Sequence, residues 1–146
     1  MDLVKLNDPP ASRDGILSLQ DSIADLPNQI DCESLNTHHF APGIYGRQMD
    51  IPAGAVIVGK IHKHAHINVI TKGTIKVVTE FGNDVYIAPK IWVSEPGTKR
   101  AVYALEDTQW LTIHANETNS QDLSELERQV IAPCFDDLDM FLEKKS

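Results

Sequence analysis

The stretch that decides the fold spans residues 54–73 and reads GAVIVGKIHKHAHINVITKG. It is rich in β-branched residues and carries a histidine at every second position, at His62, His64 and His66. Because successive side chains of a regular strand point to opposite faces, this spacing predicts that the three imidazoles share one face. Neutral imidazole is a common ligand for transition metals, so the stretch predicts a strand that carries candidate metal ligands.

On both sides of these histidines, the sequence from Cys32 to Ala115 consists of short runs of strand-forming residues, separated by turns that contain Gly, Pro or Asn. The further runs are IYGRQMDI, TIKVVTE, DVYIA, KIWVSEP, KRAVYAL and QWLTIHA. Roughly seven or eight strands with no helix between them indicate a sandwich or a jelly-roll barrel, in which interior and exterior residues alternate along each strand.

Both ends of the chain have helical patterns. The first runs from Ser12 to Leu26 and is ended by Pro27, with an apolar stripe at Ile16, Leu19, Ile23 and Leu26. A second helix is expected after Ser120, its predicted N-cap, with an apolar face at Leu123, Leu126, Val130 and Ile131; a third is expected over 135–145. We therefore expect an N-terminal helical extension (1–31), a β-barrel (32–116) and a C-terminal helical segment (117–146) that packs on the barrel or on a neighbouring subunit.

Length and charge limit the functions to consider. The 146 residues fit one domain, and a formal net charge of -8 disfavours binding to nucleic acid or to anionic membranes. No run approaches the ~20 apolar residues of a membrane span, and MDLVKLNDPP lacks the apolar core of a signal peptide, so we expect a cytoplasmic protein. Cys32 and Cys134 lie far apart and are expected to be free thiols.

The glycines around the histidines resemble the first motif of the cupin superfamily, G-x5-H-x-H-x3-E-x6-G. Counting from Gly54, the motif places Lys60 and His62 at the two histidines, His66 at the glutamate and Gly73 at the closing glycine. The literal H-x-H gives a competing register, with His62 and His64 as the pair and Asn68 at the glutamate position. That register leaves only four residues before Gly73, so the glycine spacing favours the first.

The second cupin motif, G-x5-P-x-G-x2-H-x3-N, is matched in part by Pro96-Gly97-Thr98-Lys99-Arg100, which places Arg100 where the family has a histidine. His114, near the end of QWLTIHA, is a candidate to supply the missing ligand. Arg100 stays protonated, so it suits a carboxylate or phosphate of a ligand better than a cation.

What the resemblance implies is a mainly β, cupin-type double-stranded β-helix with short terminal helices, and more narrowly the small single-domain cupins encoded by bacteriophages. Candidate ligands for a divalent transition metal (Fe, Mn, Ni or Zn) are His62, His64, His66 and His114. Candidate contacts to a small, anionic molecule are Tyr45, Arg47, Lys60 and Arg100. Tyr45 and Arg47 share a face on the strand before the histidines, where cupins bring substrate contacts into the barrel.

Two functions follow. One is a metal-binding cupin that acts on, or binds, a small anionic molecule. The other is a non-catalytic phage accessory or virion-associated module that serves as a scaffold or sequesters a ligand. The helical ends suit a homodimer or higher homo-oligomer in either case. The sequence leaves open whether the protein is an enzyme.

Overall fold

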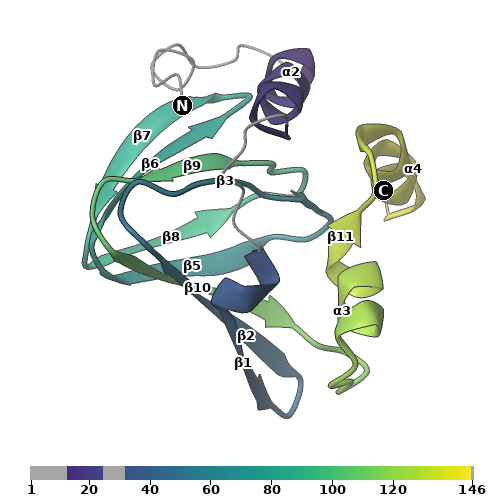
Figure 1. The fold of residues 1–146 in the computed structure, drawn as a ribbon. Coiled ribbons are helices and arrows are strands. Elements are labelled where there is room, and N and C mark those ends of the chain that lie inside the picture. Colours follow the sequence, from purple (N-terminus) through teal and green to yellow (C-terminus); the bar gives the residue numbers. More distant parts are fainter. Residues whose placement is uncertain (1–12, 25–31, 146) are drawn as a thin grey trace.

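The computed structural model describes residues 13–24 and 32–145, and its framework is two antiparallel sheets that face each other (Figure 1). The first sheet has the order β1 (Asn36–Ala41), β2 (Ile44–Ile51), β10 (Thr108–Ala115), β5 (His66–Lys72) and β8 (Lys90–Ser94). The second has the order β3 (Val56–Val58), β9 (Ala101–Ala104), β6 (Thr74–Thr79) and β7 (Gly82–Ile87). A small ribbon pairs β4 (Ile61–His62) with β11 (Ile131–Ala132). The predicted all-β centre is confirmed.

Two apolar clusters hold this framework together. The first lies between the sheets and includes Ile70 of β5, Ile75 of β6 and Trp110 of β10, all almost fully buried. The second lies under the helices and includes Ile16, Phe135 and Leu138. The helices therefore add a second apolar core to the one between the sheets. Each aliphatic side chain fully buried there stabilises the fold by roughly 1.5–3 kcal/mol.

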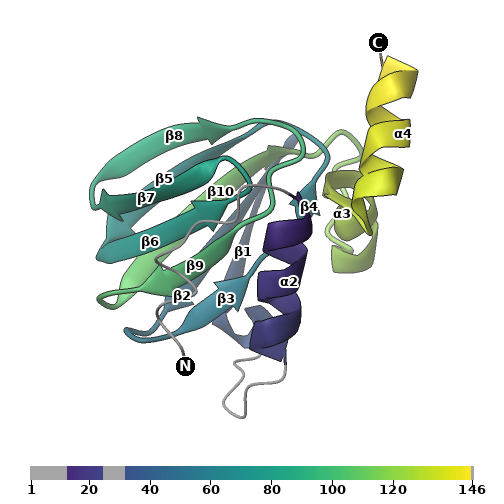
Figure 2. The same cartoon turned by 90° about the horizontal axis from the view of Figure 1, so that it is seen from above.

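The helices lie at one side of the molecule and leave β8 and β5 uncovered at the other (Figure 2). They are α2 (Arg13–Ala24), η1 (Cys32–Leu35), α3 (Leu123–Val130) and α4 (Phe135–Lys145). The predicted bounds Ser12, Leu26 and Pro27 lie outside the described residues. None of the helices in the described part is long and apolar enough to cross a membrane.

The predicted start of the second helix needs a correction. Asp122, and not Ser120, is the N-cap of α3, because its carboxylate accepts hydrogen bonds from the backbone N–H groups of Ser124 and Glu125. The Ser120 hydroxyl instead accepts from the backbone N–H of Asp122. Ile131, predicted to lie on the helix face, has left the helix and begins β11.

The prediction of one regular histidine strand was wrong. The chain leaves β3 at Val58, forms only two residues of β4, and bends through 63–65 before β5 begins at His66. At the bend the backbone N–H of Lys63 donates to the carbonyl of Val130 (2.8 Å), because this part of the chain pairs with the C-terminal segment. The bend breaks the alternation of side chains, so His64 does not share a face with the other two histidines.

Candidate functional site

Three histidines from three different strands meet inside the barrel. His62 comes from β4, His66 from the start of β5 and His114 from β10, and their exposed fractions are 4%, 3% and 5%. The ring centroid of His66 lies 4.4 Å from that of His62 and 4.7 Å from that of His114, and the His62 and His114 centroids are 5.6 Å apart. The antiparallel pairing of β10 with β5 places His114 beside His66.

All three imidazoles are neutral at pH 7. Burial lowers the pKa of His66 to about 4 and that of His114 to about 3, and it lowers the pKa of His62 well below its usual value. Repulsion from the Arg100 guanidinium lowers all three pKa values further. Each ring therefore keeps one nitrogen with a lone pair.

The ring contacts indicate where those lone pairs lie. Nδ1 of His66 is 3.4 Å from the carbonyl oxygen of His64, so it donates, and Nε2 accepts from Nη2 of Arg100 at 3.2 Å. Nε2 of His114 lies 3.1 Å from the hydroxyl of Thr112. Nδ1 of His62 faces the carbonyl of Thr98 at 3.4 Å, while its Nε2 is buried without a hydrogen-bond partner.

Arg100 is a buried cation surrounded by neutral groups. Its Nη1 donates to Oδ1 of Asn68 and to Oγ of Ser94, both at 2.9 Å, and its guanidinium lies 4.7 Å from the Trp110 ring centroid. Burial, together with repulsion from Arg47, lowers the pKa of Arg100 to about 9. A group with that pKa still carries its charge at pH 7. Across residues 13–24 and 32–145 no carboxylate forms an ion pair with either arginine.

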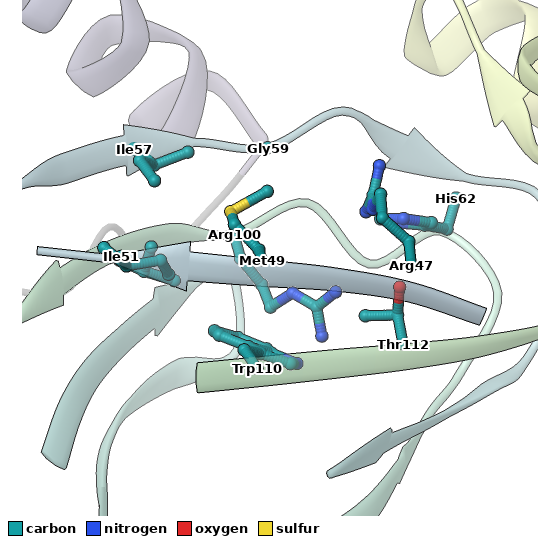
Figure 3. Close-up of a pocket in the computed structure, with 10 residues that line it drawn as sticks. Arg47, Met49, Ile51, Ile57, Gly59, His62, Arg100, Trp110 and Thr112 are labelled. Carbon is teal, nitrogen blue, oxygen red and sulfur yellow. The ribbon is translucent and has the colours of Figure 1, made fainter. Parts of the chain in front are cut away.

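His62 and Arg100 border a cavity of about 50 Å³ (Figure 3). Its polar wall consists of Arg47, His62, Arg100 and Thr112, and its apolar wall consists of Met49, Ile51, Ile57, Val102 and Trp110, with Gly59 completing the lining. The pairing of β10 with β2 places Arg47 opposite Thr112, so two arginines from opposite sides of the barrel reach one space.

Tyr45 connects the histidines to the surface. It is buried, its ring centroid lies 6.0 Å from that of His114, and its hydroxyl is 2.7 Å from Nδ1 of His38. Nε2 of His38 is 2.8 Å from a carboxylate oxygen of Glu33. Burial raises the pKa of Tyr45, so the phenol is protonated at neutral pH.

Two of the predicted site residues lie elsewhere. Lys60 is directed outward, with 63% of its side chain exposed, and forms an ion pair with Glu127. The ring of His64 packs edge-on against Phe141, and its Nε2 lies 3.1 Å from the carbonyl of Gln129. The structure thus brings His62, His66, His114, Tyr45, Arg47 and Arg100 together, and it keeps Lys60 and His64 out of the barrel.

Sequence reasoning missed that Asn68 and Ser94 hold Arg100. Asn68 was considered only as a position of the competing cupin register, although it follows His66 at strand spacing and therefore shares its face. Ser94, and Thr112 in the cavity lining, had no signal, since isolated hydroxyl residues occur on most strands. Their positions depend on the pairing of β5 with β8 and β10, which places both strands beside Asn68.

The cluster as arranged does not fit a divalent metal. In the described part of the chain, no group of three His, Cys, Asp or Glu side chains is placed to hold an ion. The reason is visible at His66, whose Nε2 lone pair faces the Arg100 guanidinium at 3.2 Å. A metal bound there would displace that hydrogen bond and lie beside a buried cation with no carboxylate to offset the repulsion.

Comparisons with known proteins agree with this architecture. The structure is similar to KdgF from a Halomonas species, with a TM-score of 0.52 and 18% identity over 66% of this chain and 90% of that one. It is also similar to a cupin superfamily protein from Desulfitobacterium hafniense, with a TM-score of 0.49 and 8% identity over 56% and 75%. The likeness to KdgF supports the cupin-type fold that the sequence predicted, and it shows the fold alone.

A further similar structure is an acetylacetone dioxygenase from Acinetobacter johnsonii, with a TM-score of 0.46 and 17% identity over 55% of this chain and 58% of that one. No family model matches the sequence, and neither does any curated protein. At these identities a likeness shows the fold alone and transfers no activity. The resemblance to phage-encoded cupins stays a prediction.

Proposed function

We propose that this cupin barrel binds a small organic anion, with Arg100 and Arg47 as its charged contacts. The observation that carries the proposal is a buried guanidinium without an acidic partner. Taking a charge out of water costs several kcal/mol unless it is paired, and the neighbours of Arg100 supply only neutral acceptors. A bound carboxylate would compensate this charge, and arginine matches a carboxylate with two parallel hydrogen bonds.

The cavity suggests what kind of anion fits. Its volume of about 50 Å³ is a third of the ~150 Å³ cavity that accepts a benzene ring, so it has room for a carboxylate-sized group. Apolar side chains line much of the remaining wall, among them Met49, Ile57 and Trp110. We therefore favour a monocarboxylate with a short apolar body over a highly charged ligand.

The neighbouring residues would tune this site. His62 presents a buried, unpartnered Nε2 at the cavity wall, which is ready to accept a hydrogen bond from a hydroxyl of the ligand. Tyr45, beside His114, stands at the end of a hydrogen-bonded path to Glu33 at the surface. Such a path suits the movement of a proton, so turnover of the bound anion is an outcome to be assayed together with binding.

The proposal is tested by titrating acetate, pyruvate and propionate into the protein and following binding by calorimetry and by the NMR signal of the Trp110 indole N–H. Arg100→Gln keeps hydrogen-bonding capacity but removes the charge, and Arg47→Gln does the same at the other wall. A charged hydrogen bond is worth roughly 1.5–3 kcal/mol, so each change is expected to weaken binding by about tenfold to a hundredfold.

Lys72→Gln is the matched control, because Lys72 is an exposed cation at the end of β5, away from the cavity lining. It should bind each carboxylate as tightly as the wild type. The proposal is overturned if none of the three carboxylates binds at millimolar concentration, or if Arg100→Gln and Lys72→Gln bind them equally well.

A further inference from the structure

A second, larger cavity lies outside the barrel, where the ribbon of β4 and β11 meets α3. Its volume is about 400 Å³, and its lining consists of Lys60, Ile61, Lys99, Glu127, Arg128, Ile131, Ala132 and Pro133. Ligand pockets typically measure ~300–1,000 Å³, so this space can accept a whole small molecule. None of the contacts to the barrel anion proposed above belongs to this lining.

Lys99 is the unusual member of the lining. Only 7% of its surface is exposed, and in the described part of the chain no side chain or carbonyl accepts a hydrogen bond from it and no acid pairs with it. Burial lowers the pKa of Lys99 from its usual value. Lysine is almost never fully buried unless it is paired, so this ammonium group lacks the partner that normally accompanies such a position.

The charges around the cavity are unbalanced. Three cations line it, and the one acid, Glu127, is already in an ion pair with Lys60. This leaves Lys99 at the inner wall and the exposed Arg128 at the rim, neither with an acidic partner among residues 13–24 and 32–145. The excess positive charge surrounds a space that is open to a ligand.

Backbone pairing fixes Lys99 in this orientation. The segment before β9 pairs with the chain around β4, since the backbone N–H of Gly59 donates to the carbonyl of Arg100 at 2.7 Å and that of His62 donates to Thr98 at 3.3 Å. Successive side chains of an extended segment point to opposite faces. Arg100 therefore lines the barrel cavity and Lys99 lines the outer one, which gives the Lys99-Arg100 pair one cation for each site.

We propose that the outer cavity is a second anion site, which takes the phosphate group of a small molecule and uses Lys99 as its buried anchor and Arg128 as its rim contact. A doubly charged phosphate matches two unpartnered cations better than a single carboxylate does. Lysine acts as a point charge toward phosphate, while arginine adds directional hydrogen bonds. The cavity also has room for the organic body that carries the phosphate.

The test uses inorganic phosphate and glycerol phosphate as probes, with binding followed by calorimetry and by ³¹P NMR. Lys99→Met keeps the length and volume of the side chain and removes its charge, so the variant should fold and should bind phosphate at least tenfold more weakly. Arg128→Gln should weaken binding several-fold. Glu127→Gln should strengthen it several-fold, because it removes the one negative charge from the lining.

Two further variants separate this site from the barrel site. Lys72→Met, an exposed cation outside the lining, should leave phosphate affinity unchanged, and so should Arg100→Gln, which alters the barrel cavity only. The proposal is overturned if phosphate does not bind at millimolar concentration, or if Lys99→Met binds it as tightly as the wild type. Loss of phosphate binding in Arg100→Gln, with retention in Lys99→Met, would place the phosphate in the barrel and also overturn it.

Discussion

The buried histidine cluster makes folding stability depend on pH in a way that can be calculated. The pKa is about 4 for His66 and about 3 for His114, against a usual value of 6.5 that applies in the unfolded chain. Since the pKa values are lower in the folded state, the unfolded chain binds more protons than the folded chain at pH values between the folded-state pKa and 6.5. The free energy of unfolding therefore falls as the pH falls below 6.5. The loss levels off below the folded-state pKa values.

The magnitude follows from the same linkage relation. A histidine that stays neutral in the folded state and has a pKa of 6.5 in the unfolded state contributes about 2 kcal/mol of lost stability between pH 7 and pH 5. His66 and His114 together would contribute roughly 4 kcal/mol, which is a large part of the ~5–15 kcal/mol total stability of ordinary domains. We therefore expect the protein to be much less stable at pH 5 than at pH 7.

The assay is urea unfolding, followed by circular dichroism at pH 7, 6 and 5, for the wild type and for His114→Gln. The variant should lose about 2 kcal/mol less than the wild type between pH 7 and pH 5, because one proton-binding group is absent from the unfolded chain. His39→Gln is the control, because His39 is exposed on β1. Parallel stability curves for the wild type and His114→Gln would refute the reasoning.

Three further predictions concern other parts of the molecule. Gly73→Ala should destabilise the fold by at least about 3 kcal/mol in urea unfolding, because Gly73 has φ +94° and an added Cβ would lie 2.3 Å from the carbonyl oxygen of Asp107; a loss under 1 kcal/mol would contradict this. Arg100→Gln should bind Ni²⁺ or Zn²⁺ more tightly than the wild type in calorimetry, because it frees His66 from a cation; equal affinity would show that Arg100 does not exclude metal. The predicted homo-oligomer should dissociate in Ile91→Lys, as measured by light scattering, because Ile91 is a 68% exposed apolar residue of β8; an unchanged mass, or a monomeric wild type, would contradict the use of β8 as an interface.

The sequence predicted the framework of the fold because framework residues carry local signals. Gly54 and Gly73 occupy turns with positive φ, a conformation that glycine adopts at no steric cost, and their spacing is what carried the cupin resemblance. The terminal helices likewise follow from periodic apolar residues such as Leu126 and Leu138, which are fully buried in the structure. Each of these signals depends on a few neighbouring residues and survives without knowledge of the tertiary contacts.

The site could be predicted only in part, because it depends on pairings between distant segments. Strand alternation alone placed His64 with its neighbours, but the pairing of β4 with β11 bends the chain and turns His64 outward. The glycine register assigned Lys60 to the barrel, yet Lys60 pairs with Glu127, which lies on a helix 67 residues later in the chain. A local pattern holds no information about that C-terminal segment.

One of the positions at which this chain departs from the cupin motifs, Arg100, accounts for much of the chemistry of the barrel. Arg100 stands where the second motif has a histidine, and its contacts in the structure follow from its charge. Its guanidinium occupies the lone pair of His66, lowers the pKa of all three buried histidines and leaves a cation at the cavity wall. Because Arg100 is the cation beside His66, the same substitution, Arg100→Gln, should weaken carboxylate binding and strengthen metal binding. A variant that moves both affinities in the same direction would separate the two effects and would show that Arg100 does not govern the charge preference of the site.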